Sequence, residues 1–228
     1  MLIKSFAKVN INLKIKKKRK HLHKICSLFT IVEDFYDEIK IEKSDNNKNI
    51  LICNIKKLET DNYILKVLEI LKKEKVIDCF YKISIQKNIP IGSGLGGGSS
   101  NAIAVAKYFT KDEKILKKIA KEVGSDCYFF IKEYKTAIVK GYGNKIKKYK
   151  KEIIIKFKDL ILTGVNCNTK EVYKKFDEIK GWENKYEKNM LEIPALKIYS
   201  ELIEYREFGQ MSGSGSTFIK KTSLSQIN

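Results

Sequence analysis

The sequence has few of the residues that build disulfide-rich, zinc-binding or membrane-spanning proteins. Its five cysteines are widely spaced, odd in number and form no Cys-x-x-Cys pair, so neither a disulfide framework nor a zinc site is indicated. Histidine occurs only at 21 and 23, with no third ligand close in sequence, and we expect it to form hydrogen bonds rather than bind metal. No window approaches 18 consecutive apolar residues, and no signal peptide precedes the first strand. We therefore expect a cytoplasmic protein with no membrane partner.

Arginine is nearly absent, at 19 and 206 only, although the formal net charge is +19. A positive surplus is typical of nucleic-acid-binding proteins, and the basic runs at 16–20 and 147–151 would be their contact points. However, lysine, isoleucine and asparagine are frequent along the whole chain, and aromatic residues do not alternate with the basic runs. We expect no nucleic-acid partner, and keep a basic RNA-binding module without catalysis as an alternative.

The glycine-rich segment at 87–101, KNIPIGSGLGGGSSN, is the most informative stretch. Alternating apolar and polar residues predict a strand over 81–86, and an apolar run predicts a helix over 101–109 capped by Ser99 and Ser100. Glycines carry no Cβ, so successive backbone N–H groups can converge on an anion at the start of such a helix. The segment therefore predicts a phosphate-binding loop rather than a flexible linker.

Two common nucleotide-binding loops do not fit this segment. No Gly-Lys-Ser or Gly-Lys-Thr follows the glycines, which excludes a Walker A loop. Gly92, Gly94 and Gly97 do spell GxGxxG, but a dinucleotide fold also needs an acidic residue after a second strand about 20 residues further on. Asp112 instead lies at the start of the next predicted helix. The pattern therefore does not favour a dinucleotide fold.

Two further features carry polar side chains of interest. Over residues 8–15 the sequence alternates strictly, so that Lys8, Asn10 and Asn12 share one face of a predicted strand. Taken alone, such a row is as often a solvated face as a site. Asp126 stands alone in the turn GSDCYFF, where an acid commonly caps a backbone group.

The remaining pattern predicts an α+β chain long enough for one large domain or two small ones. We expect strands in a mostly antiparallel sheet over 24–57, helices over 62–73 (capped by Asp61), 112–123, 169–179 and 194–205, strands within 135–143 and 153–164, and a glycine-serine turn entering a last strand over 210–219. The lysine-rich segment at 146–152 marks the predicted domain boundary.

Four motifs, taken in order, resemble the GHMP kinase superfamily of small-molecule kinases. They are the strand FAKVNINLKI, the loop PIGSGLGGGSS, the turn GSDCYFF and the late MSGSGS. Within the superfamily, HKICSLF and the triple glycine before Ser99 are most similar to the branch that phosphorylates 4-diphosphocytidyl-2-C-methylerythritol. The resemblance implies an N-terminal ATP-binding domain (1–150) with a left-handed βαβ unit and a smaller ferredoxin-like domain (151–228), with the active site in the cleft between them.

The resemblance also implies roles for individual residues. Asp126 would take or orient the proton of the substrate hydroxyl, and Lys8 would lie beside it and offset phosphoryl charge. The residues implied for ATP are Asn62, Pro90, Ile91, Gly92, Ser93, Gly94, Leu95, Gly96, Gly97, Gly98, Ser99 and Ser100, with Ser99 also reaching Mg²⁺. Those implied for the small-molecule substrate are Asn10, His23, Tyr173, Gly213, Ser214 and Gly215.

The sequence departs from this branch in three places. The family's aromatic residue before His23, which stacks on the cytosine, is Leu22; a proline after the catalytic acid is Tyr128; and Met190 follows Asn189 where an aspartate is expected. Another small alcohol, such as homoserine, mevalonate or a sugar, therefore stays open as the acceptor. We expect a monomer or a weak homodimer.

Overall fold

The computed structural model describes residues 2–16, 18, 22–60 and 62–226. The strands are β1 (Leu2–Ile15), β2 (Ile25–Lys43), β3 (Ile50–Cys53), β4 (Tyr81–Gln86), β5 (Thr136–Gly141), β6 (Lys145–Lys148), β7 (Leu160–Ile161), β8 (Gly209–Met211) and β9 (Phe218–Lys220). The α-helices are α1 (Tyr63–Lys73), α2 (Gly97–Phe109), α3 (Glu113–Val123), α4 (Cys127–Ile131), α5 (Thr169–Glu178), α6 (Glu192–Ile198) and α7 (Lys221–Leu224), and short 3-10 helices include Ser200–Glu207.

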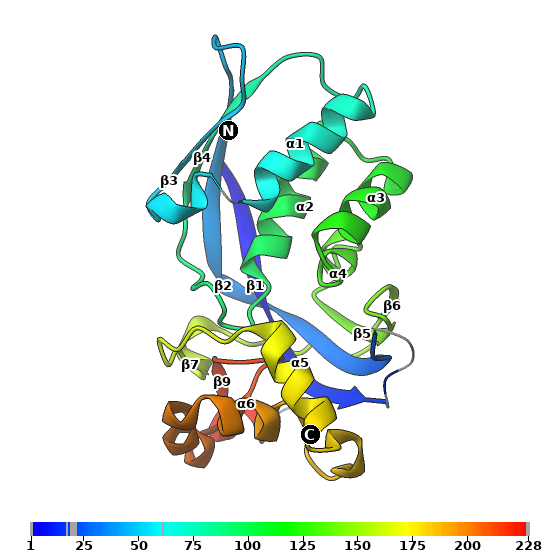
Figure 1. Cartoon of the computed structure of the whole chain (residues 1–228), viewed down its shortest axis with the longest axis vertical. Helices are drawn as coiled ribbons and strands as arrows, with labels where there is room; N and C mark the ends of the chain where they lie inside the picture. Colours follow the sequence, from blue (N-terminus) through cyan, green and yellow to red (C-terminus); the bar gives the residue numbers. More distant parts are fainter. Residues whose placement is uncertain (1, 17, 19–21, 61, 227–228) are drawn as a thin grey trace.

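A six-stranded sheet forms the larger part of the molecule. Its strand order is β3-β4-β2-β5-β6, with β1 paired to β2, and all pairs are antiparallel except β3 with β4. The strand β2 is long enough to pair with β5 through its first half and with β4 through its second half. Helices α1 to α4 cover one face of this sheet (Figure 1), where apolar residues of α1, α2 and α3 pack against those of β2 and β4.

A smaller unit follows β6 and packs against β1. It contains the three-stranded antiparallel sheet β7-β9-β8 with α5 and α6 (Figure 1). Leu13 and Ile15 of β1 share a buried cluster with Val172 and Phe176 of α5, and Leu13 forms a β-bridge with Asn189. The two units are therefore joined through β1, and the division at 150 stays a prediction.

Both faces of β1 are buried at its centre. Ala7, Val9 and Ile11 pack into a cluster with residues of the smaller unit, while Lys8 and Asn10 on the opposite face are 3% and 2% exposed. The pairing with β2 shifts register between Phe6 and Lys8 and again between Asn10 and Asn12. Bulges of this kind re-aim side chains and are frequent beside active sites.

The predicted strand at 81–86 is confirmed, as is the helix that Asp112 caps. Several boundaries were wrong. The helix predicted from Asn101 begins at Gly97 after Gly96 in a left-handed conformation, so Ser99 and Ser100 lie in its first turn and cap nothing. The cap of α1 is Asn62, whose side chain accepts a hydrogen bond from the Ile64 N–H; Asp61 and His21 lie outside the described residues.

The smaller unit differs more from the sequence pattern. Of the strands predicted over 153–164, only Leu160–Ile161 pairs in a sheet, because 157–159 forms a 3-10 turn. The helix predicted over 194–205 is divided into α6 and the 3-10 helix Ser200–Glu207. Within the described part of the chain, none of the helices combines the length and the apolarity that a bilayer crossing requires.

Candidate active site

Lys8 projects from β1 into a ring of oxygen atoms. Its Nζ donates to Asn10 Oδ1 at 2.8 Å and to the Gly94 carbonyl at 2.9 Å, and lies 3.1 Å from Asp126 Oδ2. The ammonium also lies 4.7 Å from the centroid of the Phe29 ring. An ammonium has three N–H donors, so these three oxygen atoms hold it in one position.

Asp126 reaches this lysine from the turn that joins α3 to α4. The turn is closed by a hydrogen bond from the Cys127 N–H to the Gly124 carbonyl, which places Asp126 directly before the first residue of α4. Its side chain is 31% exposed, whereas that of Lys8 is 4% exposed. The pair therefore presents a carboxylate to solvent with the ammonium behind it, which is the contact that the family resemblance implies.

The glycine loop lies against this pair. Gly92, Gly94 and Gly96 have positive φ, whereas Gly97 and Gly98 are helical, so the expected positive φ is found at three of the five glycines. A Cβ on Gly96 would meet Lys8 Cε at 2.9 Å and Asp126 Oδ2 at 3.4 Å. The Lys8 N–H also donates to the Leu95 carbonyl, so loop and strand are joined through their backbones.

The first turn of α2 offers free hydrogen-bond donors beside the carboxylate. The N–H groups of Gly97, Gly98 and Ser99 have no partner among the described residues. The Ser99 hydroxyl is near the Asp126 turn, because a Cβ on Gly124 would lie 3.8 Å from Ser99 Oγ. Unpaired amides at the positive end of a helix dipole bind phosphate groups, which fits the predicted phosphate loop.

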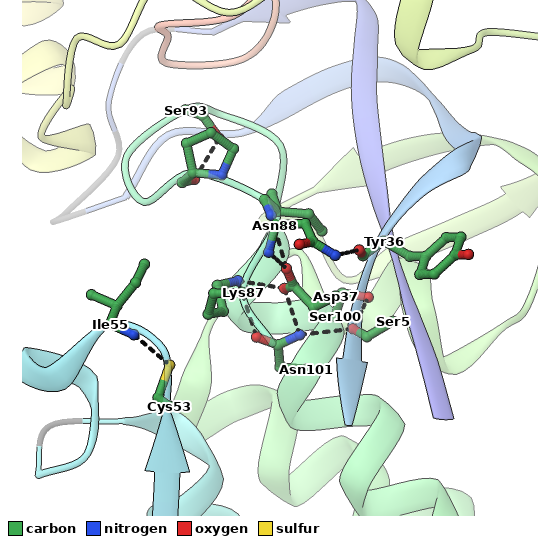
Figure 2. A network of polar contacts seen from close by, with 12 residues as sticks. Ser5, Tyr36, Asp37, Cys53, Ile55, Lys87, Asn88, Ser93, Ser100 and Asn101 are labelled. Carbon is green, nitrogen blue, oxygen red and sulfur yellow. Dashed lines mark hydrogen bonds and ion pairs between the residues drawn. The ribbon is translucent and has the colours of Figure 1, made fainter. Parts of the chain in front are cut away.

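A buried polar network fixes the base of the loop (Figure 2). The Asp37 carboxylate, on β2, is fully buried and forms an ion pair with Lys87 while accepting the N–H groups of Asn88 and Ile89 at 2.8 Å each. Asn101 of α2 donates to the same carboxylate at 2.8 Å. The network ties the strand before the loop to the helix after it, and the sequence pattern gave no sign of its acidic member.

The second glycine-serine turn, at 212–216, packs against the first loop. The Asn10 N–H donates to Ser212 Oγ at 3.0 Å, and Asn189 Nδ2 donates to the carbonyls of Met211 and Gly213 at 2.7 and 2.8 Å. A Cβ on Gly94 would meet the Ser212 carbonyl oxygen at 2.5 Å. This close approach brings Gly213, Ser214 and Gly215 to the same side of the molecule as Lys8.

A cavity of about 630 Å³ lies between the two units next to Asp126. Gly124 and Ser125, from the turn before Asp126, line one side, and Thr169 and Tyr173 of α5 line the other. Ser214 Oγ is 2.8 Å from Thr169 Oγ1, which links the second turn to the start of α5. The volume of the cavity is in the range of small-molecule binding sites.

His23 and Tyr173 meet inside this cavity. Their ring centroids are 5.2 Å apart with planes tilted by 31°, and Leu22 lines the same cavity with 60% of its surface exposed. His23 Nε2 is 2.6 Å from Asp177 Oδ1 of α5. Burial, with the negative charge of Asp126 adding to it, raises the pKa of the Tyr173 hydroxyl, so Tyr173 is neutral at pH 7.

Three other residues predicted to bind ATP use their polar side chains for hydrogen bonds within the fold. Asn62 uses its side chain as the cap of α1, although the adjacent Tyr63 ring would be 3.2 Å from a Cβ on Gly98. Ser93 Oγ donates to the Pro90 carbonyl, and Ser100 Oγ accepts from Ser5, so both hydroxyls are used within the fold. Ile91 is partly exposed and Leu95 is buried in the loop.

Three residues near the predicted site were not anticipated. Asp177 contacts His23, Phe29 lies beneath Lys8, and Ser27 Oγ accepts from Asn10 Nδ2 at 2.9 Å. Ser27 and Phe29 stand in the segment HKICSLF, which resembles the family, so that segment was a usable signal. No sequence signal indicated Asp177, since it is one of many charged residues on an amphipathic helix.

A second cavity, of about 730 Å³, lies between β1, α2 and α4. Its lining is mainly apolar and includes neither Lys8 nor Asp126. These two residues do not line the smaller cavity either, but Gly124 and Ser125, which directly precede Asp126 in the chain, do, so we place the active site beside the smaller cavity. No group of three or more metal-binding side chains is found in the described ranges.

Comparisons with known proteins agree on one family. The model of the GHMP kinase N-terminal domain matches residues 62–132. The 4-diphosphocytidyl-2-C-methyl-D-erythritol kinase of Ureaplasma parvum is 36% identical over 222 residues, covering 90% of this chain and 82% of that protein. Its counterpart from Thermotoga maritima is 32% identical over 256 residues, covering 98% and 93%.

Solved structures show the same fold. A crystal structure of 4-(cytidine 5′-diphospho)-2C-methyl-D-erythritol kinase has a TM-score of 0.73 at 23% identity, covering 96% of this chain and 89% of that one. The mevalonate kinase of Methanococcus jannaschii has a TM-score of 0.59 at 15% identity, covering 100% and 92%. The predicted α+β GHMP kinase fold is therefore confirmed. On these sequence and fold relationships, the chain belongs to the 4-diphosphocytidyl-2-C-methyl-D-erythritol kinase family of the GHMP kinases.

Proposed function

We propose that this protein transfers the γ-phosphoryl group of ATP to the 2-hydroxyl of 4-diphosphocytidyl-2-C-methylerythritol, in the non-mevalonate route to isoprenoids. The observation that carries the proposal is the Lys8–Asp126 pair, with Nζ and Oδ2 3.1 Å apart, at the start of α2 and beside the cavity. Relatives that bear the name of this kinase support the choice of acceptor.

In the proposed reaction the acceptor oxygen forms a bond to the γ-phosphorus while the bond to the bridging oxygen of ADP breaks. The hydroxyl proton passes to Asp126, and ADP leaves. Because such transition states are largely dissociative, the carboxylate needs little base strength and acts mainly by orienting the hydroxyl. The Lys8 ammonium, held by Asn10 and the Gly94 carbonyl, lies where it offsets negative charge on the transferred group.

The nucleotide phosphates are assigned to the loop 90–98 and the first turn of α2. Family membership implies ATP, and the free N–H groups of Gly97, Gly98 and Ser99 fit its phosphate oxygens. Glycine is needed at 94 and 96 because a Cβ there would fill the space beside Ser212 or Lys8. The ring of Tyr63, next to the capping residue Asn62, lies beside Gly98.

The oxygen donors around the loop fit Mg²⁺ held mainly by phosphates. Mg²⁺ usually takes one or two protein oxygens plus phosphate and water, and the described residues offer a hydroxyl at Ser99 and a carboxylate at Asp126 rather than a full cage. When bound, the ion would neutralise phosphate charge.

The acceptor is assigned to the cavity beside Asp126. His23 would hydrogen-bond the cytosine edge, and Tyr173 would stack on its face. Asn10, Gly213, Ser214 and Gly215 would line the path from the cytidine to the reacting hydroxyl. We further propose that the protein acts in the cytoplasm as a monomer or weak homodimer, without nucleic acid or membrane, a setting that suits its five free cysteines.

A coupled assay of ADP release tests the proposal. We expect acceptor-dependent turnover with 4-diphosphocytidyl-2-C-methylerythritol and much slower turnover with homoserine, mevalonate or hexoses at equal concentration. Faster turnover with one of these would assign another acceptor to the same site. Tight RNA binding with a steep salt dependence and no acceptor-dependent turnover would instead support the basic RNA-binding module.

A further inference from the structure

The His23 ring is held by one carboxylate. His23 Nε2 is 2.6 Å from Asp177 Oδ1, and the His23 side chain is 6% exposed against 25% for Asp177. The other oxygen of Asp177 is 3.2 Å from Lys18 Nζ. At neutral pH a carboxylate only accepts hydrogen bonds, so the proton of this contact must sit on Nε2.

The other ring nitrogen is left without a partner. Among the described residues, no donor or acceptor contacts His23 Nδ1, and the ring lines the 630 Å³ cavity. In a neutral imidazole with its proton on Nε2, Nδ1 is an acceptor. The aromatic contacts of His23 with Tyr173 and Phe176, at 5.2 and 5.5 Å between centroids, limit rotation of the ring.

We propose that Asp177 is a positioning residue that makes His23 Nδ1 a hydrogen-bond acceptor, so that the cavity selects a pyrimidine carrying an amino group. This inference rests on the proposed function, because it concerns the same acceptor site. Cytosine presents an exocyclic N–H₂ donor where uracil presents a carbonyl acceptor. A hydrogen-bond acceptor at Nδ1 pairs with the amino group of cytosine, whereas it faces a lone pair of the uracil carbonyl oxygen.

Asp177 lines the same cavity, and one of its oxygens contacts His23 Nε2, so it acts on the base through His23. It comes from α5, whose residues Thr169 and Tyr173 line the same cavity, so one helix supplies the stacking ring and the group that orients the histidine. Lys18 contacts the outer oxygen of Asp177 and holds the carboxylate in place.

Imidazole ¹⁵N NMR tests this directly, because the chain has only two histidines. His21→Asn leaves the signals of His23 alone. We expect wild-type His23 to carry its proton on Nε2, with a bare Nδ1. Asp177→Asn, whose amide can donate as well as accept, is expected to give a mixture of tautomers. A matched control is Glu178→Gln, the next residue of α5, which pairs with Lys175 and does not line the cavity.

The same signals report ligand selection when cytidine 5′-diphosphate or uridine 5′-diphosphate is titrated. We expect Nδ1 to respond to the cytidine nucleotide at about 5- to 150-fold lower concentration, the range that one base-edge contact provides. Asp177→Asn should lose most of this preference, and Glu178→Gln should keep it. A wild-type proton on Nδ1, or a preference unchanged in Asp177→Asn, would overturn the inference. Neither measurement needs turnover, so its failure is distinguishable from failure of the proposed kinase activity.

Discussion

Lys8 Nζ and Asp126 Oδ2 lie 3.1 Å apart, although one residue is on the first strand and the other follows the third helix. The lysine is almost fully buried and the carboxylate is partly open, so the negative group is accessible next to the cavity that Gly124 and Ser125 line, and the positive group supports it from behind. The unpaired amides of α2 are on the same side. This relationship connects the fold to the proposed chemistry.

Asp126→Asn should reduce kcat by about 10² to 10⁴-fold, because the amide cannot accept the hydroxyl proton. The side chain caps nothing, and an amide oxygen can still accept a hydrogen bond from Lys8 Nζ, so the melting temperature should change little. A matched control is Asp112→Asn, which alters the exposed cap of α3 and should leave kcat unchanged. Near-normal kcat in Asp126→Asn would remove the proposed role of this carboxylate.

Gly96→Ala should impair both folding and turnover. The residue has φ of +68°, where a Cβ costs about 1–2 kcal/mol, and the new atom would be 2.9 Å from Lys8 Cε. Gly164→Ala is a matched control, since φ is +76° there and nothing lies within 4 Å of its Cβ. Chemical denaturation should show loss of stability in both variants, with loss of kcat only in Gly96→Ala. Equal kcat in the two would show that the loop does not need this close approach.

Leu22→Tyr should tighten binding of the cytidine substrate. The leucine lines the cavity beside His23 and is 60% exposed, so a tyrosine ring has room to stack on the free face of the base. Stacking on an aromatic residue provides about 1–3 kcal/mol, which corresponds to about a 5- to 150-fold lower KM if KM reflects binding. Ile154→Tyr, which is exposed outside this cavity, controls for a general effect of an added aromatic residue. An unchanged or raised KM in Leu22→Tyr would place the base elsewhere.

Cys127 should resist thiol reagents although it is next to Asp126 in sequence. Burial raises the pKa of its thiol to about 12, so at pH 8 only about 10⁻⁴ of it is thiolate, the reactive form. Burial also raises the pKa of Cys167 to about 11, whereas Cys26 is exposed. Mass-spectrometric mapping after brief maleimide treatment should find Cys26 modified first and Cys127 only after denaturation. Because the raised pKa keeps the thiol protonated, increasing the pH from 7 to 9 should not make Cys127 react in the native protein. Rapid labelling of Cys127 would show that the α3–α4 turn opens readily.

Local patterns in the sequence predicted the elements whose neighbours are also local. The alternation at 81–86 and the acidic cap at Asp112 each depend on a few adjacent residues, and both elements form as expected. The loop between β4 and α2 was recognisable because glycines, a strand and a helix follow one another directly. The start of α2 was misplaced because glycine has low helix propensity, while packing of the 87–101 segment against β1 and β2 overrides that preference.

Contacts between segments that are distant in the sequence could not be predicted from local patterns. Nothing near Lys8 in sequence indicates that both faces of β1 would be buried, one against the smaller unit and the other against Asp126. The resemblance implied that pair, while Asp37 and Asp177 had no such signal because each acts across a long sequence separation. The strands and helices of the smaller unit, over residues 153–205, were predicted least well.

The position of the new phosphate in the product provides the most direct test. In 2-C-methylerythritol the second carbon bears a methyl group and no hydrogen, so a phosphate on its oxygen has no three-bond coupling to a proton. A proton-coupled ³¹P spectrum of the reaction with ATP and 4-diphosphocytidyl-2-C-methylerythritol should therefore show a new phosphomonoester singlet, which should grow far more slowly with Asp126→Asn. A doublet or triplet would place the phosphate on another hydroxyl, and no new phosphomonoester would contradict the proposed activity.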